Sequence, residues 1–167
     1  MMQEQVILVN EKDEQIGLME KMEAHEKGLL HRAFSVFVFN TKGELLLQQR
    51  ALHKYHSAGL WTNTCCSHPR LGEGNAEAAH RRLVEEMGFD TDLKLHTAFI
   101  YKADFDNALT EHEYDHLFIG TYNGEPVINP DEVAAYKWVD LPSLKIAIQN
   151  NPHNYTVWFK IALEKFF

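Results

Sequence analysis

Cysteine is scarce in this chain of 167 residues, and its two cysteines, Cys65 and Cys66, are adjacent. Neighbouring cysteines form neither a disulfide framework nor a C-x-x-C zinc motif, so their pattern suits a reducing compartment. The sequence also lacks a long apolar run, and its first fifteen residues have neither the basic nor the apolar segment of a signal peptide. We therefore expect a cytoplasmic protein with no membrane association.

Basic residues are outnumbered, with 16 Lys and Arg against 24 Asp and Glu, which gives a formal net charge of −8. This balance argues against a nucleic-acid partner, because phosphate backbones would be repelled. An anionic small molecule would need cations gathered at its binding site. Nothing in the composition implies a protein partner.

Only nine glycines and five prolines interrupt a chain that is 45% hydrophobic, which excludes a collagenous or disordered protein. The length fits one compact domain over residues 1–167. Apolar runs and turn signals predict strands at 6–9, 32–39, 44–49, 93–101, 113–122 and 134–139. Helical spacing predicts helices at 75–87, from Pro142 onward, and at 155–166. The second and third strands should form a hairpin around Asn40-Thr41-Lys42-Gly43, and Asn75 should cap the first helix. The predicted fold is α/β (α+β), a mixed β-sheet sandwiched between α-helices.

Histidine is abundant, with ten in the chain, and this residue is the commonest metal ligand. Lys21 and His25 are one helical turn apart, just before His31. In the segment TEHEYDH, strand alternation aligns Glu111 with Glu113. Paired carboxylates indicate either a metal site or an acid–base pair, although a solvated edge strand has the same pattern. A shell of imidazoles and carboxylates would suit Mn²⁺, Zn²⁺ or Mg²⁺.

The segment NTCCSHP concentrates reactive groups. If it is extended, Cys66 and His68 point to one side and Cys65 and Ser67 to the other. Cys66 is then the candidate proton donor, base or nucleophile, and two buried structural cysteines are the alternative.

Residues 67–89 (SHPRLGEGNAEAAHRRLVEEMGF) resemble a Nudix box, G-x5-E-x7-R-E-U-x-E-E-x-G-U. Ser67 stands where the box has its first glycine, and Arg82 replaces the first glutamate of R-E-U-x-E-E. An arginine there is suited to gripping a diphosphate. The matching positions are Glu73, Arg81, Leu83, Glu85, Glu86, Gly88 and Phe89.

Together with EKMEAHEKGLLHRAFSVFVFN, QQRALHK and WTNTCCSHP, these features resemble the type I isopentenyl-diphosphate Δ-isomerases of the Nudix superfamily. The resemblance implies conversion of isopentenyl diphosphate into dimethylallyl diphosphate, with Cys66 and Glu113 as the acid–base pair. It also implies that Glu86 holds a Mg²⁺ bridging to the diphosphate. The ligands of a further divalent ion would be His25, His31, His68, Glu111 and Glu113.

This reaction adds a proton to an alkene and removes another, which requires a positioned acid and base. We expect Tyr101 to hydrogen-bond the Glu113 carboxylate. By the resemblance, Trp158 faces the carbocation intermediate, and Trp61 is a second candidate. The candidates for diphosphate binding are Lys21, Arg50, Lys54, Ser67 and Arg82.

Three other functions use parts of the same sequence. A Nudix hydrolase of a nucleoside diphosphate derivative would need the carboxylate that Arg82 replaces. A histidine-rich metal-binding module would not need Cys66, and a Cys–His hydrolase would need a third triad member that is not evident. A flavin-dependent isomerase is disfavoured because no glycine-rich cofactor motif occurs.

Overall fold

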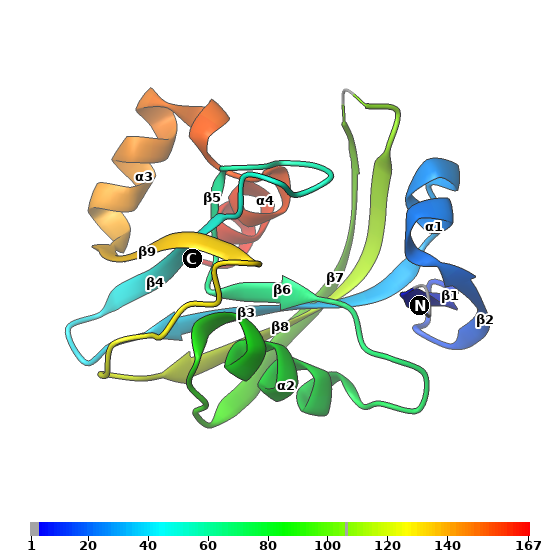
Figure 1. Cartoon of the computed structure of the whole chain (residues 1–167), viewed down its shortest axis with the longest axis horizontal. Coiled ribbons are helices and arrows are strands. Elements are labelled where there is room, and N and C mark those ends of the chain that lie inside the picture. The colour runs from blue at the N-terminus through cyan, green and yellow to red at the C-terminus, as the bar shows by residue number, and fades with distance from the viewer. Residues whose placement is uncertain (1–3, 106) are drawn as a thin grey trace.

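The computed structural model describes residues 4–105 and 107–167 of the chain (Figure 1). Its helices are α1 (Lys21–Lys27), α2 (Asn75–Met87), α3 (Leu141–Asn150) and α4 (Val157–Phe166), with a 3-10 turn at Pro152–Asn154. Its strands are β1 (Gln5–Val9), β2 (Gln15–Glu20), β3 (His31–Phe39), β4 (Glu44–Arg50), β5 (Trp61–Thr62), β6 (Cys65–Ser67), β7 (Leu93–Asp104), β8 (Thr110–Thr121) and β9 (Val133–Asp140). None of the described helices is both long enough and apolar enough to cross a membrane.

Strand β3 organises the sheet. It pairs in parallel with β8 along its whole length, from His31 opposite Glu113 to Phe39 opposite Thr121. It also pairs antiparallel with β6, and β8 pairs antiparallel with β7. Parallel and antiparallel neighbours in one sheet confirm the predicted mixed sheet.

The predicted hairpin of β3 and β4 forms only at its closed end, where Phe39 pairs with Leu45. The turn has the expected chemistry, since the Asn40 side chain accepts hydrogen bonds from the Lys42 and Glu44 amides. Beyond the turn the strands diverge, because β6 pairs with β3 and β9 pairs with β4. The residues of this turn therefore determine where the chain reverses, but they do not determine which strands pair with β3 and β4.

Helices cover both faces of the sheet, as predicted (Figure 1). Side chains of β3 alternate, so Phe34, Val36 and Val38 pack in the same core as α2. Phe37 points to the opposite face and packs in the core that α3 and α4 complete. This double burial explains why the sequence of β3 is apolar almost throughout.

The N-cap of helix α2 lies one residue earlier than predicted. Gly74 is the N-cap and makes no side-chain capping bond, while Asn75 is the first helical residue. The helix ends at Gly88, which has a φ of +72°. A β-carbon there would lie 2.3 Å from the Val127 carbonyl oxygen, so this site requires glycine.

Candidate active site and metal centre

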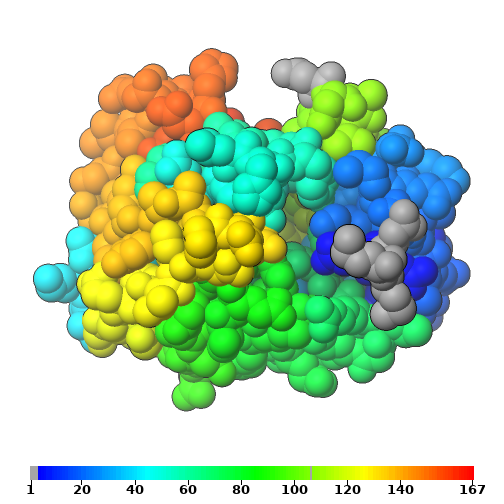
Figure 2. All heavy atoms as spheres, in the orientation of Figure 1, coloured from blue at the N-terminus to red at the C-terminus, as the bar shows by residue number. Residues whose placement is uncertain are grey.

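A pocket of about 200 Å³ opens on one face of the molecule. Figure 2 shows this face hollowed between the cyan segment that follows β4, the blue N-terminal segment and the green segment that carries α2. All of the site residues predicted from the sequence line this pocket, except His25 and His31. Trp61 is not among the lining residues.

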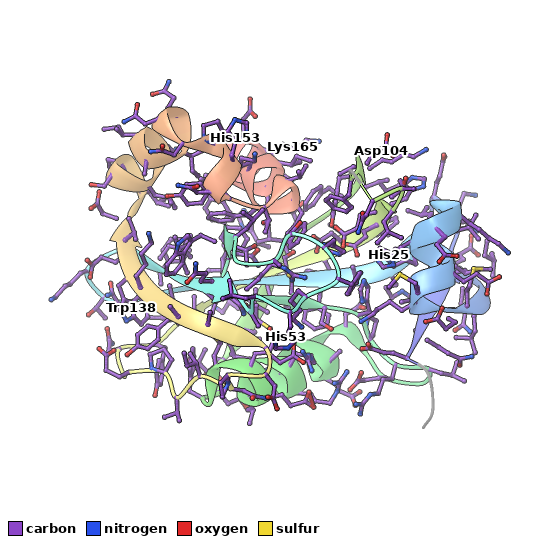
Figure 3. The ribbon with its side chains drawn as sticks, turned by 45° about the horizontal axis from the view of Figure 1, so that its top comes forward. His25, His53, Asp104, Trp138, His153 and Lys165 are labelled. Carbon is purple, nitrogen blue, oxygen red and sulfur yellow. The ribbon has the colours of Figure 1, made fainter. Side chains whose placement is uncertain are left out.

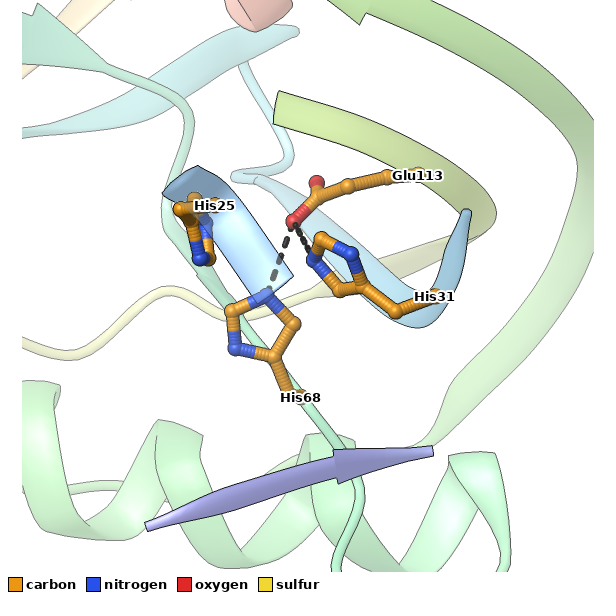
Figure 4. Close-up of side chains that lie close together, drawn as sticks. All are labelled: His25, His31, His68 and Glu113. Carbon is orange, nitrogen blue, oxygen red and sulfur yellow. Dashed lines mark hydrogen bonds and ion pairs between the residues drawn. The ribbon is translucent and has the colours of Figure 1, made fainter. Parts of the chain in front are cut away.

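Two histidine side chains contact the same carboxylate oxygen of Glu113 at the edge of the pocket. Glu113 Oε2 lies 3.1 Å from His31 Nε2 and 2.8 Å from His68 Nε2 (Figure 4). His25 joins them, and one ligand atom from each of the four residues lies within 4.8 Å of the others. Residues from α1, β3, β8 and the end of β6 are thus gathered at a single point.

The fold explains this convergence. Because β3 and β8 run in parallel with His31 opposite Glu113, two residues far apart in the sequence become neighbours. Helix α1 is capped by the Glu20 side chain and ends at Gly28, and this short helix buries His25 against the sheet.

The imidazole nitrogens of His25 and His31 are oriented as metal ligands are. His25 Nδ1 lies 2.6 Å from the Lys21 carbonyl oxygen, and His31 Nδ1 lies 2.9 Å from that of Leu29. An Nδ1–H donated to a carbonyl leaves Nε2 free to bind a metal. The His25 Nε2 is buried and has no hydrogen-bond partner among the described residues. A divalent ion held there would satisfy it.

Tyr101 connects the two carboxylates of β8. Its hydroxyl lies 2.9 Å from Glu111 Oε2 and also donates to Glu113 Oε1. Burial and both carboxylates raise the pKa of Tyr101 well above its usual value, which keeps the phenol a donor. The predicted alternation is confirmed, since Glu111 and Glu113 line the pocket while His112 contacts the Gly28 carbonyl.

The two candidate acid–base residues have opposite protonation states. Burial raises the pKa of the Cys66 thiol well above its usual range, so the thiol keeps its proton. Burial also tends to raise the pKa of Glu113, but the His31 and His68 imidazoles against its carboxylate reverse this and hold that pKa well below its usual value. The pocket therefore contains a protonated thiol and an ionised carboxylate. Cys65 faces the core beneath α2 instead, as strand alternation predicted. The same alternation placed Ser67 on the side of Cys65, and this was wrong, because Ser67 lines the pocket beside Cys66 and His68 at the end of the short strand β6.

Cationic side chains line another part of the pocket. Arg82 Nη2 lies 3.1 Å from Glu86 Oε2 and 3.4 Å from Glu132 Oε2. Lys54 forms an ion pair with the same Glu132. Each cation therefore rests against a carboxylate and is available to a stronger anionic ligand.

The other two cations lie beside aromatic rings. Lys21 Nζ is 5.0 Å from the centre of the Tyr55 ring and 2.7 Å from Glu4. The Arg50 guanidinium is 5.2 Å from the centre of the Trp158 indole. Trp158 is 3% exposed, and its ring nitrogen has no hydrogen-bond partner among the described residues.

Comparison with known proteins places these features in a family. A NUDIX domain model matches residues 29–159. The isopentenyl-diphosphate Delta-isomerase 2 of Photorhabdus laumondii is 60% identical over 159 residues, covering 95% of this chain and 90% of that protein. The chain belongs to the NUDIX domain family and, within it, to the isopentenyl-diphosphate Delta-isomerases. The resemblance inferred from the sequence motifs is thereby confirmed.

Two further matches agree with this family. The protein of the same name from Aromatoleum aromaticum is 51% identical and covers 98% of this chain and 87% of its own length. A crystal structure from Deinococcus radiodurans has a TM-score of 0.80 at 19% identity, covering 98% of this chain and all of the other. The second match shows the fold alone.

The Nudix box has both structural and pocket-facing parts. Arg81 makes two hydrogen bonds to the Glu73 carboxylate, at 2.7 and 2.9 Å, and so ties the loop before α2 to the helix. Arg82, which departs from the box, faces the pocket together with Ser67, the other departure. Both departures from the Nudix box therefore line the same pocket as Cys66 and Glu113.

Sequence reasoning missed His56. No motif in the sequence marks this residue, but it is 6% exposed, lines the pocket and has its Nε2 3.5 Å from Glu111 Oε1. It belongs to an irregular loop, where no periodicity relates its direction to that of other ligands. Glu132 was also missed, because its role depends on Lys54 and Arg82, which are distant in the sequence.

Proposed function

We propose that this protein converts isopentenyl diphosphate into dimethylallyl diphosphate by adding and removing a proton. The observation that carries the proposal is that Cys66 and Glu113 line one pocket with four cationic side chains. The chain's relatives at 46–60% identity bear the isomerase name. These two findings support the same chemistry from independent directions.

Cys66 and Glu113 serve as the acid–base pair. Isomerisation needs one group that carries a proton and one that accepts a proton, and the protonated thiol and ionised carboxylate meet this need. Positioned general acids and bases each contribute about 10²–10⁴-fold to rate. Tyr101 orients the Glu113 carboxylate through its hydrogen bond.

The divalent ion is bound by His25, His31, His68, Glu111 and Glu113. The orphaned His25 Nε2 and the mixed nitrogen–oxygen donor set support this assignment, and they suit Mn²⁺, Zn²⁺ or Mg²⁺. Such an ion supplies positive charge that keeps the carboxylates ionised. A second ion, Mg²⁺, would be held at Glu86 and neutralise the substrate's diphosphate.

The diphosphate is bound by four cationic side chains and one serine, namely Lys21, Arg50, Lys54, Arg82 and Ser67. Their gathering in one pocket of a protein with a net charge of −8 provides the local compensation that an anionic substrate needs. Trp158 then faces the hydrocarbon part, where an aromatic face stabilises a developing cation by about 0.5–2 kcal/mol. No flavin is required by this scheme.

Residues 1–167 act as one unit in this proposal, because the pocket takes Lys21 from the start of the chain and Trp158 from its last helix. The unbridged cysteines support a cytoplasmic location, and the acidic net charge supports a small-molecule partner rather than a nucleic acid. We propose no membrane or protein partner.

The direct test is to incubate the protein with isopentenyl diphosphate, Mg²⁺ and Mn²⁺ in deuterated water and to follow the products by NMR. We expect dimethylallyl diphosphate, with deuterium incorporated where the proton is added. Release of phosphate or pyrophosphate without isomer would replace the proposal with hydrolysis.

A further inference from the structure

The hydroxyl of Thr156 is directed away from the helix that it precedes. Thr156 is the N-cap of α4, a position where a threonine side chain commonly accepts a hydrogen bond from the first turn of the helix. Here it makes no capping bond, and its hydroxyl lies 2.8 Å from the hydroxyl of Thr62 on β5. Both residues are at most 1% exposed. A buried contact between residues 94 positions apart therefore takes the place of the helix cap.

The Thr62 hydroxyl also contacts Asn63. Thr62 Oγ1 lies 2.9 Å from Asn63 Oδ1, and only the hydroxyl can donate in that pair. Because a hydroxyl has one proton, Thr156 is then the donor to Thr62. The Asn63 amide in turn donates to the carbonyl oxygens of Cys65, at 2.8 Å, and Val36, at 3.2 Å. These hydrogen bonds run in one direction through a threonine–asparagine network of Thr156, Thr62 and Asn63.

Backbone bonds attach the start of α4 to the same strand. The Thr156 amide donates to the Trp61 carbonyl oxygen at 3.0 Å, and Trp61 forms a parallel bridge with Tyr155. In Figure 3, the label His153 marks the turn that leads into this helix. Replacing a threonine hydroxyl leaves these backbone bonds in place, so it changes only how closely the first turn of α4 is held.

The two ends of the threonine–asparagine network are next to pocket residues. The Cys65 carbonyl belongs to the peptide bond that precedes Cys66. At the other end, Trp158 lies two residues beyond Thr156, in the first turn of α4. Cys66 and Trp158 both line the pocket and pack in one apolar cluster. The network therefore connects the strand that carries the thiol with the helix that carries the indole.

We propose that Thr62, Asn63 and Thr156 are positioning residues, which fix the separation of Cys66 and Trp158 across the pocket. None of the three is among the residues that line it, so they act through these two side chains. The inference rests on the proposed isomerisation, in which a proton moves between Cys66 and the hydrocarbon while the indole faces the positive charge. Such geometry is demanding, because a displacement of about 1 Å can cost about 10²-fold in rate.

The test compares Thr156→Val, which removes the hydroxyl at nearly constant shape, with Thr156→Ser, which keeps the hydroxyl. Melting curves are recorded first, and kinetics with isopentenyl diphosphate are measured well below the lowest melting temperature. We expect Thr156→Val to lower kcat by about 10–100-fold and to leave KM within about twofold, because the cations that bind the diphosphate lie outside the network. Thr156→Ser should keep kcat within about threefold of the unmodified protein.

The matched control is Thr91→Val. The Thr91 hydroxyl donates to the Thr121 carbonyl oxygen at 2.6 Å, and neither residue lines the pocket. This variant loses a hydrogen bond of similar kind and should keep both kcat and KM within about twofold. A loss of kcat in Thr91→Val equal to that in Thr156→Val would mean that the effect comes from stability, and would overturn the inference.

A second pair of variants tests whether the hydroxyls act in series. Thr62→Val already disconnects Thr156, so the double variant Thr62→Val/Thr156→Val should have a kcat within about twofold of Thr62→Val alone. If Thr156→Val does not fold, Thr62→Val is compared with Thr62→Ser in the same way. Losses that multiply in the double variant, an unchanged kcat in the valine variants, or equal losses in valine and serine variants would each overturn the inference.

The same assay separates this inference from the function on which it rests. If the unmodified protein and Thr156→Val form dimethylallyl diphosphate equally fast, the positioning role alone is refuted. If the unmodified protein releases phosphate or pyrophosphate and forms no isomer, the proposed function is refuted and the positioning role with it.

Discussion

Tyr101 on β7 lies directly opposite Glu113 on β8, and its hydroxyl donates a hydrogen bond to the Glu113 carboxylate. The same hydroxyl lies 2.9 Å from Glu111. One phenol thus fixes the orientation of both carboxylates at the back of the pocket. The hydroxyl has a single proton, which the two ionised carboxylates share, and a hydrogen bond to an ionised oxygen is among the stronger kinds.

Tyr101→Phe keeps the ring and removes this hydroxyl. We expect kcat to fall by about 10–100-fold, because hydrogen bonds to charged groups are worth about 1.5–3 kcal/mol. Thermal stability should also fall, because buried carboxylate oxygens lose their donor, so activity is compared well below the melting temperature. Steady-state kinetics with isopentenyl diphosphate and a melting curve check both parts. Full activity in Tyr101→Phe would show that the carboxylates are oriented without it.

Cys66→Ala and Glu113→Gln each remove one member of the proposed acid–base pair. We expect turnover to fall by at least about 10³-fold in either variant, as is common when a positioned acid or base is lost. The matched control is Cys65→Ala, which removes the neighbouring thiol on the core side of β6. Because that thiol donates to Glu86 Oε2 at 3.2 Å, this variant should retain most of the activity at saturating Mg²⁺. Deuterium exchange by NMR detects residual turnover. Comparable losses in Cys65→Ala and Cys66→Ala would mean that the effect comes from packing.

Alternation along strands made several of these side chains predictable from the sequence. Cys66 and His68 were expected to share a face, as were Glu111 and Glu113, and all four line the pocket. A period of two is a local property, which the chain shows wherever it is extended. The covering helices and the mixed sheet followed from similarly local patterns.

Long-range pairing was not predictable in the same way. Glu113 meets His31 because β3 and β8 align in parallel, and no local signal sets that register. The hairpin of β3 and β4 was expected to extend further than it does. It is short because β3 pairs with β6 and β4 pairs with β9, and the turn residues carry no information about these partners. His56 reaches the site from an irregular loop, which carries no period from which to infer its direction.

Neighbouring arginines on α2 should have separable roles. Arg82 faces the pocket beside Glu86 and Glu132, whereas Arg81 is bound to Glu73 at the loop before the helix. We expect Arg82→Met to raise KM for isopentenyl diphosphate by about 10–100-fold, since a charge-assisted contact with the diphosphate is lost. Arg81→Met should instead lower the melting temperature with KM within about threefold, because partly exposed ion pairs contribute about 0.2–1 kcal/mol. Equal KM values in the two variants would contradict the assigned positions.

Trp158 should act through its aromatic face. Its indole lies in the pocket, while Trp61 packs outside the pocket under Lys137, 4.2 Å from the ring centre. We expect Trp158→Phe to lower kcat by about 3–30-fold. A cation–π interaction is worth about 0.5–2 kcal/mol, and phenylalanine attracts a cation more weakly than tryptophan does. Trp61→Phe should leave kcat within about twofold. Trp158→Ala would also destabilise the fold by about 3–5 kcal/mol, so the conservative variant is the informative one. If the two tryptophan-to-phenylalanine variants lose activity equally, Trp158 does not stabilise the intermediate and its burial serves the core of α4 alone.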